Sequence, residues 1–341
     1  MKAASLERLQ KLICLLANGQ FHSGQYLAEN IGVSRTAIWK LISKLQTWQI
    51  EIFAVRGKGY RIPGGLTLID SDYLNQKITS KAKLFSVVEV LPTVDSTADH
   101  LTRSWKSAPG KGRICVAEHQ TKGRGRKGRK WISPFGANLY FSLGLNLPLG
   151  LSALGGLSLA VGIGLTKFLN QHSQERVSLK WPNDLLLNNK KLAGILVEAS
   201  GDSNDSSFLN IGIGINWDMQ TSHTDEIDQP WANLRSQLNT DISRSDLLAL
   251  ILLQLDDVLG SYIESGFDSF RKEWSSHSAY FGKSVVLHTH QGKVAGTEIG
   301  IDKAGAIKIK TADGEKRFFS GEVSLRSSHN DSSHTESIHD D

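Results

Sequence analysis

Apolar residues recur at helical spacing three times within the first 50 residues, and a short alternating segment follows them. Asn18-Gly19 is suited to end the first helix, and Ser23 and Ser34 are suited to cap the next two. In chain order, the predicted elements are a helix over 5–18, a helix after Ser23, a helix over 35–47, and a hairpin of 51–56 with 60–62. This order is typical of a winged helix-turn-helix.

From about residue 66, short apolar runs alternate with amphipathic stretches, which predicts a mixed α/β domain. The predicted strands are 84–90, 114–117, 138–145, 177–181, 184–187, 193–199 and 209–215, and the predicted helices are 151–169, 245–264 and 267–275. After Gly282 only short β segments separated by Gly turns remain, which predicts a small barrel. These segments are 284–289, 293–299, 306–311 and 316–319.

The same pattern divides the chain into domains of an α+β protein. Pro63-Gly64-Gly65 has the composition of a linker, and the last fifteen residues are polar and without apolar period. The predicted organisation is a winged helix-turn-helix at 1–64, a mixed α/β domain at 66–280, a β-barrel at 281–326 and a disordered tail at 327–341.

A length of 341 residues and an apolar fraction of 40% fit two or three domains with buried cores. No uninterrupted apolar run reaches the roughly 18 residues that span a bilayer, and the N-terminus lacks a secretory pattern. We therefore expect a cytoplasmic protein that has no membrane partner. Cys14 and Cys115 each lie in an apolar stretch, so we expect both in the core rather than in a disulfide or metal site.

The net charge of +5 is unevenly distributed. Residues 1–64 hold nine Lys and Arg against three Asp and Glu, and residues 122–130 hold six Lys and Arg without an acid. Two separate basic regions indicate two separate anionic partners.

The first basic region coincides with the predicted winged helix, so we expect it to bind DNA. A docking or dimerisation domain with a solvated basic face is the alternative, and the basic excess together with the hairpin favours DNA. The side chains expected to contact DNA are Ser34, Arg35, Thr36, Trp39, Lys40, Lys44, Arg56 and Lys58, with Arg61 beside them.

The second basic region is a glycine-rich segment that we call the arginine loop, residues 122–131. Glycines let a backbone approach an anion closely, and arginines add planar bidentate donors. Because six cations repel one another, a bound phosphate or carboxylate would order this loop. A flexible RNA-binding or charged surface loop is the alternative. A Walker loop is excluded because its Gly-Lys-[Ser/Thr] ending is missing, and arginines would crowd the phosphate seat of a Rossmann turn.

The sequence Gly-Arg-Gly-Arg-Lys-Gly-Arg-Lys-Trp over 123–131 resembles the ligand loop of the biotin protein ligase family. Further family signatures occur in the family's order, namely Asp95-Ser96-Thr97, Ser133-Pro134, Gly136-Ala137-Asn138-Leu139, Lys180-Trp181-Pro182-Asn183-Asp184, the segment 191–198 and Gly212-Ile213-Gly214-Ile215-Asn216. The resemblance spans residues 5–326, and the winged helix is similar to that of the subgroup that is both ligase and repressor.

This resemblance implies a central domain of the class II aminoacyl-tRNA synthetase/biotin–lipoate ligase fold and an SH3-like C-terminal barrel. It implies that biotin and ATP, with Mg²⁺, form biotinyl-5′-AMP, which then biotinylates a lysine of the biotin carboxyl carrier protein of acetyl-CoA carboxylase. It also implies repression of biotin synthesis genes with the adenylate as corepressor, and an adenylate-bound homodimer on two-fold operator DNA.

The resemblance also implies roles for individual residues. Lys191, Arg124 and Arg126 are expected to be catalytic, because fixed cations stabilise the charge on the carboxylate and the α-phosphate. The residues expected to bind biotin are Ser96, Thr97, Ala98, Gln120, Arg124, Gly125, Arg126 and Lys191. Those expected on the ATP and adenylate side are Gly123, Arg126, Lys127, Gly128, Arg129, Trp131, Lys180, Asn183, Asp184, Asn216 and Trp231. No residue is expected to hold a metal without the nucleotide.

Several of these residues have a structural alternative. Lys191 could be a surface lysine of a hairpin, Asp184 could cap a turn, Asn216 could end a strand, and Ser96-Thr97 could cap a helix. Ala98 stands where the family commonly has Asn, so a side-chain amide contact is lost there. Three other functions remain open: a lipoate protein ligase, a biotin-sensing transcription factor without catalysis, and an RNA-binding protein.

Overall fold

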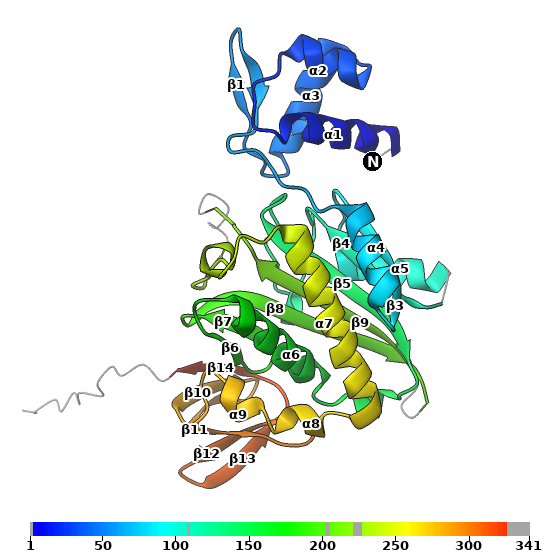
Figure 1. Cartoon of the computed structure of the whole chain (residues 1–341). Coiled ribbons are helices and arrows are strands. Elements are labelled where there is room, and N and C mark those ends of the chain that lie inside the picture. Colours follow the sequence, from blue (N-terminus) through cyan, green and yellow to red (C-terminus); the bar gives the residue numbers. More distant parts are fainter. Residues whose placement is uncertain (1–2, 108–109, 202–204, 221–226, 326–341) are drawn as a thin grey trace, which may run out of the picture.

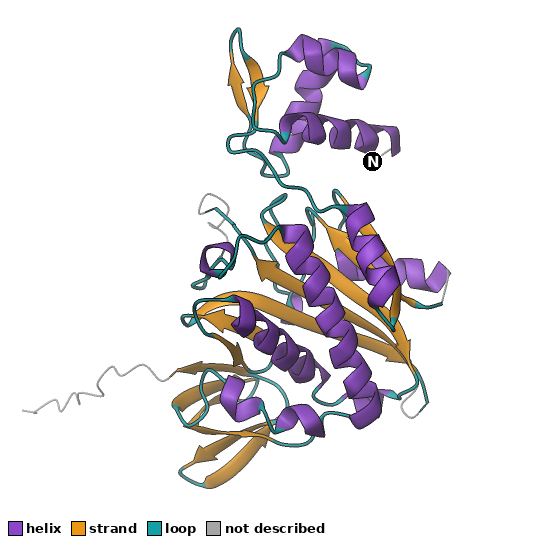
Figure 2. Cartoon of the chain, in the orientation of Figure 1, coloured by secondary structure: helices purple, strands orange, loops and turns teal. Residues whose placement is uncertain are grey.

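The computed structural model describes residues 3–107, 110–201, 205–220 and 227–325. The N-terminal helices stand apart from a large central sheet, and a smaller sheet lies at the opposite end of the molecule (Figure 1). Helices cover the central sheet, whereas the C-terminal part of the chain consists mostly of strands (Figure 2). The predicted tail at 327–341 lies outside the described residues.

The N-terminal domain has the predicted element order. It consists of α1 (Ala3–Leu16), α2 (Gly24–Ile31), α3 (Arg35–Gln46), β1 (Phe53–Val55) and β2 (Gly59–Arg61). The hydroxyls of Ser23 and Ser34 accept hydrogen bonds from the backbone N–H of Tyr26 and Ala37, so both predicted helix caps are confirmed. The apolar faces of the three helices and of the hairpin pack into one core of their own.

The central sheet has seven strands in the order β3-β4-β5-β9-β8-β7-β6. Among these described strands only the β3–β4 pair is parallel, and the other neighbours are antiparallel. The strands are β3 (Phe85–Leu91), β4 (Gly112–Ala117), β5 (Asn138–Leu147), β6 (Val177–Lys180), β7 (Asp184–Leu187), β8 (Lys190–Gly201) and β9 (Ser207–Asn216). Each coincides with a strand that the sequence predicts, and β4, β5, β8 and β9 are longer than expected.

Helices cover both faces of this sheet. On one face, α4 (Ser71–Lys81) and α6 (Leu157–His172) both pack against the long α7 (Arg244–Ser265). On the other, α5 (Thr97–Ser107) packs on β4, β5 and β9. The helix predicted at 151–169 is in fact divided, because Gly156 adopts φ +77° between a short 3-10 turn and α6. Phe267 packs so closely there that a Cβ on Gly156 would lie 2.4 Å from its ring.

The segment Leu151–His172 passes the length and hydropathy test for a membrane-spanning helix, although it contains no long uninterrupted apolar run. Its apolar side chains lie against the sheet and α7, and Ala160, Val161, Ile163 and Leu165 are fully buried. The segment is therefore the core helix of the central domain.

The C-terminal part begins with two short helices, α8 (Asp268–Arg271) and α9 (Trp274–His277), where the sequence predicts one helix over 267–275. A five-stranded antiparallel sheet follows, in the order β13-β12-β11-β10-β14. Its strands are β10 (Ser284–Thr289), β11 (Gly292–Ile301), β12 (Ile307–Thr311), β13 (Gly314–Phe318) and β14 (Glu322–Leu325). The buried carboxylate of Glu298 accepts hydrogen bonds from Trp274 and Ser278, which fixes α9 to this sheet.

One prediction about the core is wrong. Cys115 is fully buried in β4, but Cys14 is exposed on α1. The reason is helical geometry: Leu12, Ile13 and Leu16 already fill the inner face of α1, and the side chain between them points outward.

The N-terminal and central domains meet through a stack of aromatic rings. Trp48, which follows α3 and is 2% exposed, stacks on His119 at 5.7 Å and on Phe135 at 5.8 Å between ring centroids. Burial, with a contribution from the Lys44 cation, lowers the pKa of His119 to about 4, so the ring is neutral at physiological pH. Phe135 therefore packs into the core of the N-terminal domain, although in sequence it belongs to the central domain.

Next to this stack, a buried ion pair fixes the segment that follows the linker. Arg244 at the start of α7 and Glu118 after β4 lie 2.7 Å apart, with side chains 2% and 5% exposed. The guanidinium also donates to the carbonyls of Thr67 and Asn138, and the carboxylate accepts from the N–H of Ile69. Both charged groups of the pair are thus hydrogen-bonded on more than one side, as buried charges require.

Candidate functional site

A cavity of about 280 Å³ opens on the α5 face of the central sheet. Its walls are the start of α5, the middle of β5, β8 and β9, and the arginine loop. The predicted site residues that line it are Ser96, Thr97, Ala98, Gln120, Arg124, Gly125, Arg126, Arg129, Trp131, Asn183, Asp184, Lys191, Asn216 and Trp231. Four others, Gly123, Lys127, Gly128 and Lys180, lie outside this lining.

Glycines form the floor of the cavity. Gly194 of β8 and Gly214 of β9 lie under the indole of Trp131, and a Cβ on Gly214 would come within 2.4 Å of that ring. Gly212 is less crowded, since a Cβ there would lie 3.6 Å from the Ser142 hydroxyl and 3.9 Å from the Ala98 side chain. Flat backbone at these positions lets a ring lie directly on the sheet, which explains the Gly-x-Gly pattern.

One end of the cavity is a network of neutral polar groups. Ser96 and Thr97 are 2% and 4% exposed. The backbone N–H and hydroxyl of Thr97 donate to Gln120 Oε1 at 2.9 and 3.2 Å, and the Thr97 hydroxyl also lies 2.8 Å from that of Ser142. Gln120 in turn donates to Ser133. Sequence reasoning missed Ser142, whose signal was only a polar residue within an otherwise apolar strand.

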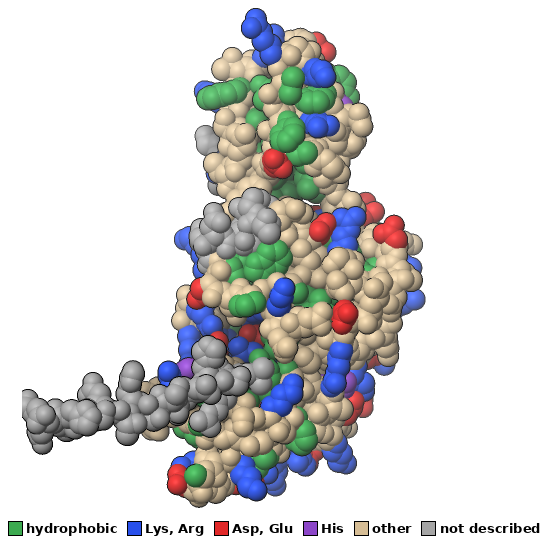
Figure 3. Space-filling model, turned by 90° about the vertical axis from the view of Figure 1, so that its left-hand side faces the viewer, with side chains coloured by type: hydrophobic (Ala, Val, Ile, Leu, Met, Phe, Trp, Pro, Cys, Tyr) green, Lys and Arg blue, Asp and Glu red, His purple; other side chains and the backbone are tan. Residues whose placement is uncertain are grey.

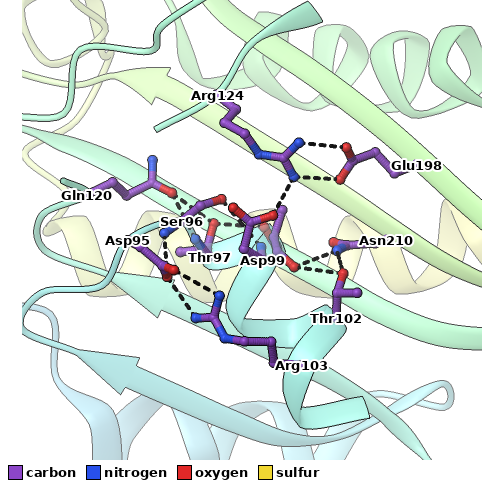
Figure 4. Close-up of polar contacts among 12 residues, drawn as sticks. Asp95, Ser96, Thr97, Asp99, Thr102, Arg103, Gln120, Arg124, Glu198 and Asn210 are labelled. Atoms are coloured by element: carbon purple, nitrogen blue, oxygen red, sulfur yellow. Dashed lines mark hydrogen bonds and ion pairs between the residues drawn. The ribbon is translucent and has the colours of Figure 1, made fainter. Parts of the chain in front are cut away.

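Two contacts hold this end of α5 in place (Figure 4). Arg103 donates two hydrogen bonds of 2.8 Å to the carboxylate of Asp95, just before Ser96. Asn210 of β9 donates to the carbonyl of Ala98 at 2.7 Å and to the hydroxyl of Thr102. An amide from β9 therefore contacts the backbone at Ala98.

The other end of the cavity carries charge. Lys191 Nζ lies 2.9 Å from Asp184 Oδ1, with side chains 15% and 14% exposed, and 5.4 Å from the ring centre of Trp131. Asn216 donates to the carbonyl of Lys191, and Trp231 forms a parallel bridge with that residue. Lys191 is therefore fixed inside the cavity, although it follows the exposed Lys190 in sequence.

The C-terminal sheet supplies a residue that sequence reasoning missed. Glu322, at the start of β14, lies 3.2 Å from Arg129 and 3.6 Å from Lys180. Burial alone would raise the pKa of this carboxyl, but the two cations outweigh burial and lower it, so Glu322 is ionised. Nothing in its local sequence pointed to these partners, because the contact depends on how the two domains pack.

The predicted DNA-contacting residues belong to α3, its N-cap and the hairpin of the N-terminal domain. All eight, from Ser34 before α3 to Lys58 in the hairpin turn, are exposed, whereas Arg61 is half-buried beside the rings of Phe21 and Phe53. Trp39 of α3 is 59% exposed. Blue basic and green apolar side chains share the visible face of this upper domain (Figure 3).

The chain matches three family models along its length. They are the HTH domain at 7–61, the biotin/lipoate A/B protein ligase family at 90–216, and the biotin protein ligase C terminal domain at 280–326. The residues matched by the second model include most of those that line the cavity, and the residues matched by the third include the strand that carries Glu322.

Similar proteins cover the chain almost from end to end. The bifunctional ligase/repressor BirA of Salmonella typhimurium is 39% identical over 93% of this chain and 97% of its own length. The Bacillus subtilis protein of the same name is 31% identical over 91% and 95%. The structure of biotin protein ligase from Aquifex aeolicus in complex with biotin and ATP superposes with a TM-score of 0.58 and 33% identity, covering 72% of this chain and 99% of that one. With its helix-turn-helix domain, its ligase domain and its C-terminal sheet, the chain belongs to the family of bifunctional biotin protein ligases and repressors.

Proposed function

We propose that this chain uses ATP to attach biotin to a lysine of a carboxylase carrier protein, and that it represses biotin synthesis genes by binding operator DNA. The observation that carries the proposal is the cavity, which has a neutral hydrogen-bonding end at Thr97 and Gln120 and a cationic end at Lys191 and Arg126. Biotin has the same polarity: a ureido ring at one end and a carboxylate at the other.

The geometry supports a division of roles along the cavity. The ureido ring hydrogen-bonds with Ser96, Thr97 and Gln120, while the tail lies on the floor at Gly212, which the ring of Trp131 does not cover, and runs toward Trp131. Its carboxylate reaches Lys191, which lies close enough to neutralise both this group and the α-phosphate as they approach each other. Cations that are already fixed in place stabilise the charge that develops in the transition state without reorganising.

Asn183, Asp184, Asn216 and Trp231 surround Lys191 and form the proposed nucleotide side. Burial lowers the pKa of Arg126, which donates a hydrogen bond to Asn183 at 3.3 Å. Mg²⁺ enters the proposal as the ion carried by the triphosphate, and Asp184 offers the hard oxygen that this ion prefers. Arg129 and Lys180, both paired with Glu322, add positive charge at the same edge.

The first test is the intact mass of a carrier domain after incubation with this chain, Mg²⁺-ATP and either biotin or lipoate. We expect a gain of one biotin, no gain with lipoate, and no gain without ATP. A gain with lipoate alone would establish a lipoate ligase. Binding of biotin without any gain in mass would leave a biotin-sensing transcription factor.

The DNA-binding half is tested by removing cations from α3. Because Arg35 and Lys40 are exposed there, Arg35→Ala and Lys40→Ala should each weaken binding about tenfold. Each should also reduce the slope of log K against log salt by about one if it contacts a phosphate. The measurement is fluorescence anisotropy with a labelled duplex selected for binding to the wild-type chain.

Lys11→Ala is the matched control, since Lys11 is an exposed cation of the same domain that pairs with Glu7 on α1. We expect its affinity for the duplex to be unchanged, and the biotinylation rate to be unchanged in all three variants. Equal binding by the wild type and both α3 variants would refute the assignment of this helix to DNA.

The homodimer is also part of the proposal. The pairing of β7 with β8 ends at Gly194, and β8 continues to Gly201 with β9 alone beside it among the described strands. A strand edge of this kind can pair with a second copy. A two-fold dimer would present two winged helices to a palindromic operator.

A further inference from the structure

The arginine loop is attached to the rest of the chain by three guanidinium groups. Within the loop, Trp131 donates to the carbonyl of Gly123 and Gly125 to that of Arg129, which makes a closed hairpin. Its three arginines reach outward in different directions. Arg124 reaches α5 and β8, Arg126 reaches Asn183 before β7, and Arg129 reaches Glu322 of β14.

Arg124 has the strongest of these attachments. Its Nη1 and Nη2 donate to the two carboxylate oxygens of Glu198, both at 3.0 Å, and Nη2 also donates to Asp99 at 2.7 Å. Figure 4 shows the guanidinium between the two acids, with Glu198 on one side and Asp99 on the other. Bidentate arginine–carboxylate pairs are the geometrically specific kind of ion pair. Arg126, in contrast, makes its hydrogen bond to a neutral amide at 3.3 Å.

The two acids come from two different elements beside the cavity. Asp99 lies in the first turn of α5, two residues after Thr97, and Glu198 lies on β8, four residues after Gly194 of the floor. A guanidinium held by both therefore ties the arginine loop, which lines the cavity, to α5 and to β8. The three side chains are 36–40% exposed, so water can reach the contact and compete for it.

We propose that Glu198 and Asp99 are positioning residues that hold the arginine loop closed over the cavity by binding Arg124. In this arrangement Arg124 acts as the latch of the loop, and Arg126 is the loop cation that remains available to the bound anion. The consequence for ligand binding rests on the proposed function, but closure of the loop itself does not.

Limited trypsin digestion of the full chain measures loop opening directly, because residues 122–130 contain six Lys and Arg. Cuts within this segment are identified by mass spectrometry. We expect Glu198→Gln and Asp99→Asn each to raise the rate of the first cut there about two- to fivefold, the range expected for a partly exposed ion pair. The control is Glu273→Gln, because Glu273 is also 39% exposed and pairs with Lys167 at 2.9 Å, far from the loop in sequence. It should leave the rate unchanged.

Two further measurements separate a latch from a general loss of structure. In an Arg124→Gln background, Glu198→Gln should have no additional effect on cutting, because its partner is already absent. In the otherwise wild-type chain, Glu198→Gln should speed release of bound biotin by the same factor as it speeds cutting. An unchanged cutting rate in both acid variants overturns the latch. Faster cutting with unchanged biotin release keeps the latch and contradicts the placement of biotin in this cavity.

Discussion

Replacing Lys191 by alanine is expected to lower kcat/KM for adenylate formation about 100- to 1000-fold, the usual loss when one fixed group that stabilises developing charge is removed. The reason is its position: the Lys191 side chain is 15% exposed, its ammonium is held 2.9 Å from Asp184, and it lies at the cationic end of the cavity. Pyrophosphate release with biotin and Mg²⁺-ATP measures the effect.

Lys190→Ala is the matched control for this change. Lys190 is the preceding residue of the same strand, carries the same charge and is exposed to solvent. We expect a rate within about twofold of the wild type, because an exposed charge contributes little. If both variants lost activity equally, net charge rather than the placement of Lys191 would be responsible.

Replacing Arg244 by methionine should lower the free energy of unfolding of the central domain by about 3–5 kcal/mol, because Glu118 would then be a buried charge without its cation. The carbonyls of Thr67 and Asn138 would lose their donor as well. Urea denaturation followed by tryptophan fluorescence measures the loss. The double variant Glu118→Leu/Arg244→Met should be less destabilised than the sum of its two single changes, since it leaves no unpaired charge.

Arg235→Met is the control for burial, since Arg235 lies 2.7 Å from Asp218 but is 58% exposed. A loss below about 1 kcal/mol is expected for such a pair. If Arg244→Met lowered the free energy of unfolding no more than Arg235→Met does, the buried pair with Glu118 would contribute little to the stability of this domain.

The elements that the sequence predicted best are those whose own residues determine them. The caps at Ser23 and Ser34 and the apolar runs of β5 and β9 are local signals, and the structure confirms all four. The motifs also located most of the residues that line the cavity, since each motif marks one wall. Their roles toward ligands stay predictions.

The features that the sequence did not predict depend on contacts between distant segments. The helix α4 has a weak apolar pattern because it packs only at the edge of the sheet, beside β3 and α7. Glu322 meets Arg129 and Lys180 only because the C-terminal sheet packs near β6, and Trp48 stacks on Phe135 from another domain. Asn210 contacts Ala98 across 112 residues of chain. Periodicity within one segment carries no information about such partners.

The ring stack at Trp48 limits how this protein can be shortened. A chain that began after the linker would expose the ring of Phe135, now 5% exposed, and one face of His119 to water. His119 directly precedes Gln120, whose amide holds Thr97 at the polar end of the cavity. The N-terminal domain therefore also stabilises the central domain beside the cavity. A shortened chain without it would need residues that tolerate solvent in place of Phe135 and His119.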